Sequence, residues 1–167
     1  MELKELFLQY EKNINDLIKL CKGKTLAFDF DGTLTRFQYN EERMLPCNDE
    51  DIEAYTKSGG NIYTNIYVLK TMKYIMSQLN KDDVFIVTST VPSLREIKNK
   101  IIFEHFNIPC EHIIHTDGSL KKINVLIDIH NKTQKNILFI EDNYKILLTA
   151  EENLNFVRSY HISSLLA

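Results

Sequence analysis

Three short apolar segments constrain the fold of this chain more than any other feature. They occupy residues 25–30, 84–87 and 136–140 of the 167-residue sequence, and segments with helical periodicity separate them. Short, nearly continuous apolar runs are typical of strands buried on both faces. Strands that alternate with helices form right-handed crossovers and a parallel sheet. The sequence therefore predicts a doubly wound α/β domain, in which ligands bind at the carboxyl ends of the strands.

The remaining segments complete this pattern. Residues 3–18 place apolar side chains on one helical face and charges of both signs on the other, which favours a helix packed on the core. Further helices are expected at 65–78, 91–106, 119–132 and 144–152, and short strands at 112–116 and 156–162. We expect one domain over residues 1–167, with an N-terminal helix within 1–22.

Residues 36–62 have a different character, with Pro46, Gly59, Gly60 and an acidic run but no sustained period. We predict a small insertion after the first strand. It would carry one short helix at about 49–57, capped by Asn48 or Asp49 and ended by the glycine pair.

Composition limits which cellular compartment and which kinds of partner we expect. The net charge of −3 gives no basic excess, so nucleic acid is a less favoured partner. The three cysteines have no CxxC spacing, which favours reduced thiols in the cytoplasm. The longest apolar runs fall far short of the roughly 20 residues of a membrane helix, and the N-terminus does not resemble a signal peptide. We expect a cytoplasmic domain without a membrane partner.

Polar side chains gather where the apolar strands end. Asp29 and Asp31 follow the first strand, Thr88 and Ser89 the second, and Glu141 and Asp142 the third; Lys121 and Lys122 open a helix. Parallel strands bring these groups to one edge of the sheet. Four carboxylates repel one another unless a cation lies among them, and hard oxygen ligands suit Mg²⁺. A lysine and a hydroxyl nearby are groups that bind a phosphate.

In this order the motifs resemble those of the haloacid dehalogenase (HAD) superfamily of phosphohydrolases. The first motif stands here as "LAFDFDGT", the second as Thr88 in "VFIVTS", the third as Lys121 or Lys122, and the fourth as "ILFIEDN". The resemblance covers about residues 24–160 and implies a Rossmann-like core. Only about fifty residues separate the first two motifs, so the resemblance implies a minimally capped member. The position of a further acid that members often carry holds the apolar Ile146.

The resemblance implies Mg²⁺-dependent hydrolysis of a phosphomonoester through an aspartyl-phosphate. Asp29 would be the nucleophile, and Asp31 would protonate the leaving group and later activate water. Because side chains at i and i+2 of a strand share a face, we expect the two aspartates to do so. The backbone N–H of Gly32 is expected to approach the phosphoryl oxygens.

The resemblance also assigns the binding groups. Thr88 and a lysine would bind the phosphoryl group, with Thr33 and Ser89 as further substrate contacts. Mg²⁺ would be held by Asp29, the backbone carbonyl of Asp31, and Asp142, with Glu141 bound directly or through water.

Helical periodicity separates the two candidate lysines. Lys122 begins the face that continues with Val125, Leu126 and Ile129, which we expect to point inward. Lys121 lies about 100° around the helix. We therefore favour Lys122 and keep Lys121 as the alternative.

Other interpretations use the same residue types. A receiver-like phosphotransfer protein also has an acceptor aspartate, paired acids, a hydroxyl and a lysine, but its acidic pair and its acceptor follow different strands. A non-catalytic domain that binds Mg²⁺ or phosphate is the second alternative. A dehalogenase is disfavoured, because it has no use for Asp31 as an acid.

The substrate stays open. A small cap implies either an exposed site for a phosphorylated protein or nucleic-acid end, or a homo-oligomer in which a neighbouring subunit covers a small metabolite.

Overall fold

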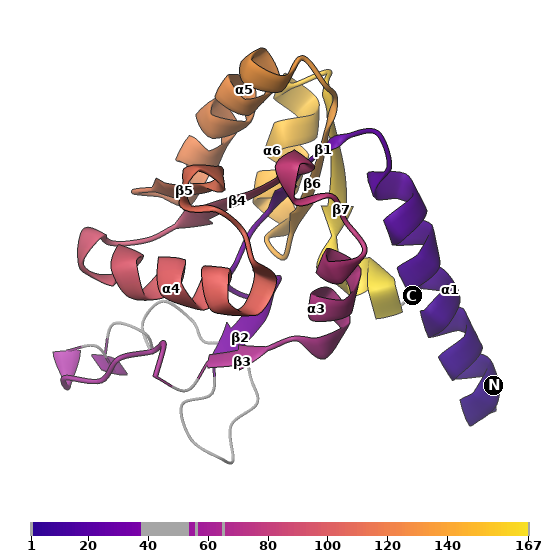
Figure 1. Cartoon of the computed structure of the whole chain (residues 1–167), viewed down its shortest axis with the longest axis horizontal. Coiled ribbons are helices and arrows are strands. Elements are labelled where there is room, and N and C mark those ends of the chain that lie inside the picture. The colour runs from indigo at the N-terminus through magenta and orange to yellow at the C-terminus, as the bar shows by residue number, and fades with distance from the viewer. Residues whose placement is uncertain (1, 38–53, 56, 65, 167) are drawn as a thin grey trace.

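A parallel five-stranded sheet forms the centre of the structure, a computed structural model that describes residues 2–37, 54–55, 57–64 and 66–166 (Figure 1). The strand order is β5-β4-β1-β6-β7, and all four pairings are parallel. Helices cover both faces, so the prediction of a doubly wound, Rossmann-like α/β fold is confirmed. Along the chain the elements are α1 (Leu3–Cys21), β1 (Thr25–Phe28), β2 (Thr35–Phe37), β3 (Ile66–Val68), α3 (Lys70–Ser77), β4 (Val84–Ser89), α4 (Arg95–Phe106), β5 (Ile113–Thr116), α5 (Lys122–Thr133), β6 (Ile137–Glu141), α6 (Tyr144–Asn153) and β7 (Val157–His161).

Side chains of the central strands alternate between two apolar layers. In β1, Leu26 and Phe28 join the layer covered by α1, α3 and α4, whereas Ala27 joins the layer covered by α5 and α6. Strands β4 and β6 alternate in the same way. This alternation decides which helix each polar residue at a strand end can meet. Thr88 continues the α4 side of β4, and Glu141 continues the α5 side of β6.

The segment between Thr35 and Ser77 corrects one prediction. The helix expected over 65–78 begins only at Lys70, and Ile66–Val68 form β3, which pairs antiparallel with β2. The β-branched Ile66 and Val68 favour a strand once a partner strand is available. Three residues are too few for periodicity to separate a helix from a strand. Most of the predicted insertion, including the cap at Asn48 or Asp49, lies outside the described residues.

Helix α1, Leu3–Cys21, lies within the predicted range of 1–22 but shows only part of the predicted packing. Leu17 and Cys21 are buried in the core, whereas Leu3 and Phe7 are 69% and 63% exposed. The N-terminal end of α1 projects beyond the helix layer that its other end joins (Figure 1). Within the described ranges, no helix has both the length and the apolar character needed to span a membrane.

Candidate active site

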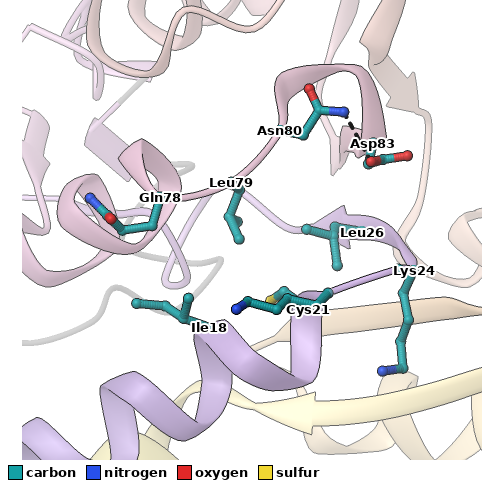
Figure 2. A pocket seen from close by; sticks show the side chains of 10 residues that line it. Ile18, Cys21, Lys24, Leu26, Gln78, Leu79, Asn80 and Asp83 are labelled. Atoms are coloured by element: carbon teal, nitrogen blue, oxygen red, sulfur yellow. Dashed lines mark hydrogen bonds between the residues drawn. The ribbon is translucent and has the colours of Figure 1, made fainter.

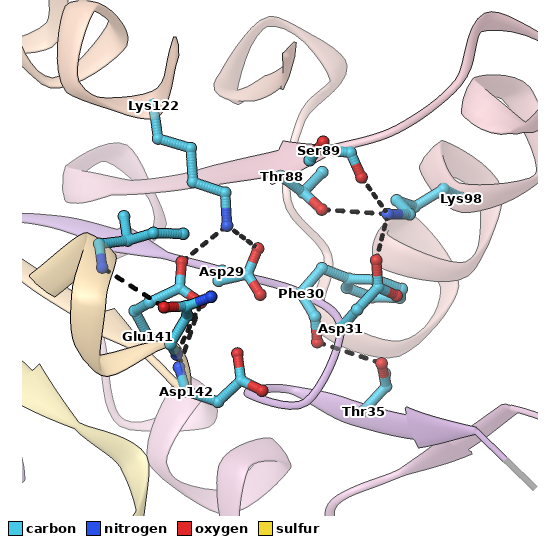
Figure 3. Close-up of polar contacts among 12 residues, drawn as sticks. Asp29, Phe30, Asp31, Thr35, Thr88, Ser89, Lys98, Lys122, Glu141 and Asp142 are labelled. Atoms are coloured by element: carbon cyan, nitrogen blue, oxygen red, sulfur yellow. Dashed lines mark hydrogen bonds and ion pairs between the residues drawn. The ribbon is translucent and has the colours of Figure 1, made fainter. Parts of the chain in front are cut away.

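The polar residues at the carboxyl ends of β1, β4 and β6 come together at one edge of the sheet (Figure 3). Two buried lysines divide them into two groups. Lys122, from the first turn of α5, lies between Asp29 and Glu141, and Lys98, from α4, lies between Thr88 and Asp31. The two lysines approach from opposite faces of the sheet, as the alternation in β4 and β6 requires.

Lys122 makes two short charge-assisted hydrogen bonds. Its Nζ donates to Asp29 Oδ1 and to Glu141 Oε2, each at 2.6 Å, and all three side chains are at most 6% exposed. Burial alone would lower the pKa of Lys122, but Asp29 and Glu141 outweigh it and hold that pKa above its ordinary value. Lys122 therefore carries its charge at neutral pH.

Glu141 is held on both sides. Its Oε1 accepts the backbone N–H groups of Asp142 and Asn143, each at 3.2 Å, while Oε2 accepts from Lys122. With both oxygens occupied in this way, Glu141 is better arranged to hold Lys122 than to bind a cation directly.

Asp142 lies against the turn that follows β1. Its carboxylate is so close to Gly32 that a Cβ added there would be 2.1 Å from Oδ2 and 2.6 Å from Cγ. Gly32 also has a φ of +81°, which favours glycine. The glycine of the first motif thus makes room for the acid of the fourth.

The structure corrects two predictions about this turn. Gly32 N–H donates to Thr35 O at 2.9 Å, so it is not directed at a phosphoryl group. Asp29 and Asp31 do not share the face of a strand, since they contact lysines from opposite sides of the sheet. The reason is that β1 ends at Phe28 and the chain turns before Asp31.

Asp31 binds a lysine that we did not anticipate. Lys98 Nζ donates to Asp31 Oδ2 at 2.5 Å, to Thr88 Oγ1 at 3.0 Å and to Ser89 O at 3.3 Å. Lys98 is 0% exposed. The sequence carried a signal for it, because position 98 falls on the same helical stripe as Leu94, Ile101 and Ile102. A lysine on an apolar stripe needs an acidic partner in the core.

The other predicted substrate contacts lie in different places. Ser89 contacts Lys98 through its backbone carbonyl. Thr33 is fully buried, and its hydroxyl has no partner among the described residues. Lys121 is exposed and pairs with Asp117 at 2.7 Å, away from the acids that Lys122 contacts.

The donor set fits a divalent cation. Oxygen atoms of Asp29, Glu141 and Asp142 lie within 4.8 Å of one another. With Asp31 they make four carboxylates against two ammonium groups, which leaves two negative charges for a cation to neutralise. Carboxylate oxygens are the ligands that Mg²⁺ prefers.

Asp31, Glu141 and Asp142 hold protons more strongly than free carboxylates do. Burial, followed by the neighbouring Asp29, raises the pKa of Glu141 to about 8. Burial also raises the pKa of Asp31 and of Asp142, although Lys98 opposes this at Asp31 and the hydrogen bond with Glu141 opposes it at Asp142. A cation would favour the charged forms and release these protons.

A pocket at the opposite edge of the sheet has no such chemistry (Figure 2). It has a volume of about 210 Å³ and lies between the end of α1, the start of β1 and the end of α3. Among the described residues that line it, Asp83 alone has a carboxylate, and this carboxylate pairs with Lys135 at 2.6 Å. The acids and buried lysines therefore mark the carboxyl edge as the candidate active site.

Known proteins offer little similarity to this chain. No family model matches the chain, and no curated protein matches it. Among solved structures, the chain is similar to the HAD domain of effector protein Lem4 from Legionella pneumophila. The identity is 18%, the alignment covers 81% of this chain and 84% of that chain, and the TM-score is 0.47. A proposal about activity therefore rests on the residues and contacts of the site.

Proposed function

We propose that this protein is a Mg²⁺-dependent phosphomonoester hydrolase that acts through an aspartyl-phosphate at Asp29. The observation that carries the proposal is the buried Lys122, held at 2.6 Å from both Asp29 and Glu141 beside the Asp142 carboxylate. A buried lysine between two acids could be a structural ion pair. The additional acids at the same edge, which exceed the lysines in charge, favour a site for a cation and a phosphate.

In the first step Asp29 attacks phosphorus, and the bond between phosphorus and the ester oxygen breaks. The leaving oxygen takes a proton from Asp31, so that an alcohol departs and Asp29 carries the phosphoryl group. In the second step water attacks phosphorus and gives a proton to Asp31. The bond between Asp29 and phosphorus then breaks, which releases inorganic phosphate and restores both side chains.

The remaining residues bind and orient. Lys122 donates to two acceptors among the described residues, and its ammonium group has three donors, so one N–H is left for a phosphoryl oxygen. Thr88 would donate its hydroxyl proton to the same group. Asp29 and Asp142 would hold Mg²⁺ directly, with Glu141 linked through water and the backbone carbonyl of Asp31 as a further ligand. The cation would supply charge stabilisation for the phosphoryl oxygens.

The rival interpretations fit this arrangement less well. A receiver-like protein separates its acidic pair from its acceptor aspartate, whereas here the turn after β1 carries both Asp29 and Asp31. A dehalogenase does not need a second acid such as Asp31. A non-catalytic binding domain remains the second candidate, because Lys122 and the acids could bind a phosphate without cleaving it.

The proposal implies a phosphorylated substrate in the cytoplasm, either a small metabolite or a macromolecule. Its test is a panel of phosphate esters, including p-nitrophenyl phosphate, assayed with Mg²⁺ and with EDTA. We expect Mg²⁺-dependent release of phosphate by the native protein and none by a folded Asp29→Asn variant. Phosphate binding without turnover of any ester would instead support the binding domain.

A further inference from the structure

Lys98 is the one buried charge at this edge of the sheet, among the described residues, that the proposed reaction does not use. Its ammonium group lies 5.4 Å from the ring centroid of Phe30 and 5.3 Å from that of Tyr63. Burying an ammonium group costs several kcal/mol unless partners compensate. The partners of Lys98 therefore indicate why a lysine occupies this position.

All three N–H groups of Lys98 are in use. They donate to Asp31 Oδ2, Thr88 Oγ1 and Ser89 O, at 2.5, 3.0 and 3.3 Å. An ammonium group has three donors and no acceptor. Lys98 therefore has none left for a substrate and differs in this respect from Lys122.

At Asp31 this arrangement makes the two carboxylate oxygens different. Lys98 binds Oδ2, and the Tyr63 hydroxyl donates to the same oxygen at 3.5 Å. Oδ1 is buried and accepts no hydrogen bond from any described residue. A buried polar atom without a partner costs about 1–3 kcal/mol. A ligand that donates a proton to Oδ1, or accepts a proton from it, would remove that cost.

At Thr88 the same lysine sets the direction of the hydroxyl group. Because Oγ1 accepts from Lys98, the proton of Thr88 has to be donated elsewhere. Thr88 is fully buried at the end of β4.

We infer that Lys98 is a positioning residue that orients two groups of the site at once. It binds Oδ2 of Asp31 so that Oδ1 is the oxygen that exchanges a proton with the leaving group, and it directs the Thr88 hydroxyl proton toward the phosphoryl group. Lys98 itself touches neither. This inference rests on the proposed function, since it assigns a purpose to Lys98 within the same reaction.

The test uses the dependence of the rate on the leaving group. A p-nitrophenolate ion leaves readily without a proton, whereas an alkoxide does not. Lys98→Met removes the ammonium group and retains an unbranched side chain of similar length. We expect its kcat/KM with an alkyl phosphate to fall by about 100-fold or more. The fall in kcat/KM with p-nitrophenyl phosphate should be about ten times smaller than that.

Two further variants sharpen the comparison. Asp31→Asn should change the ratio of kcat/KM for the two esters in the same direction as Lys98→Met. The double variant that carries both substitutions should change this ratio no further than Asp31→Asn alone, because coupled residues are non-additive. Lys100→Met is the matched control, because Lys100 lies on the same helix, is exposed and pairs only weakly with Glu104 at 3.8 Å. It should leave both rates unchanged.

An equal loss with both esters would overturn the inference, because a merely structural lysine affects them alike. If Lys98→Met does not fold, Lys98→Arg takes its place. Its planar guanidinium keeps the charge but cannot reproduce the three-donor geometry. An unchanged ratio of kcat/KM for the two esters would therefore overturn the inference.

Native protein that hydrolyses neither ester would refute the proposed function instead. Crystal structures then decide about Lys98: displaced Asp31 and Thr88 side chains in Lys98→Met support the positioning role, and unmoved ones overturn it.

Discussion

Replacing Gly32 with alanine tests the contact between the first and the fourth motif. The new Cβ would lie 2.1 Å from Asp142 Oδ2 and 2.6 Å from Cγ, which is closer than any stable contact. Asp142 is exposed, so its carboxylate can rotate away without disturbing the core. The backbone strain at a φ of +81° adds about 1–2 kcal/mol of destabilisation. The two effects are separable, because one acts on stability and the other on the metal site.

Gly23→Ala provides the matched control. Gly23 has a φ of +71° and no atom within 4 Å of an added Cβ, so it carries the strain without the contact. In urea unfolding with EDTA, both variants should lose about 1–2 kcal/mol of stability. A displacement of about 1 Å in a reacting group can cost about 100-fold in rate, and we expect a loss of that order in kcat/KM for Gly32→Ala at limiting Mg²⁺.

Gly23→Ala should retain the native Mg²⁺ dependence of the rate. If Gly32→Ala also retains it, Asp142 does not hold the cation where we propose. If both variants lose activity equally, strain accounts for the effect, and the contact with Asp142 is unimportant.

Two other predictions concern the same group of charges. The pKa of Glu141 is raised from 4.5 to about 8, so between these pH values the folded metal-free protein binds more protons than the unfolded chain. The contribution of Glu141 to stability is therefore lost as pH rises through that range. Mg²⁺ should raise the melting temperature more at about pH 8 than at about pH 5, and an equal rise at both would contradict the proposed site. Lys122→Met leaves Asp29 and Glu141 buried without their partner and should lower the free energy of unfolding by about 3–5 kcal/mol in urea with EDTA. Lys121→Met removes an exposed pair and should lower it by less than about 0.5 kcal/mol. Similar losses for the two variants would show that Lys122 is not the buried partner of the acids.

The sequence was sufficient for the sheet and most of its helices, because the apolar strands and the periodic segments are strong local signals. It failed at Ile66–Val68, where the state depends on pairing with β2, a contact that is distant along the chain. It also predicted that the apolar face of α1 packs on the core, but periodicity does not show how far the core extends beneath that face.

The candidate site was predictable in composition and only partly in geometry. Helical periodicity favoured Lys122, which the structure places between Asp29 and Glu141. The positions of Asp31 and Lys98 depend on how the chain turns after Phe28, which the strand rule for i and i+2 does not describe. If the alternation of side chains in β4 is extended to Thr88, this side chain faces α4, and a hydrogen-bond partner on α4 is expected.

Detection of a phosphorylated Asp29 tests the central claim most directly. The protein is mixed with p-nitrophenyl phosphate and Mg²⁺, quenched in acid during turnover, and digested for mass spectrometry. We predict one added phosphoryl group on the peptide that contains Asp29, located at Asp29 by fragmentation and absent from Asp29→Asn. Turnover with no phosphoryl group on that peptide, or with the group on Asp31, would contradict the assignment of Asp29 as the nucleophile.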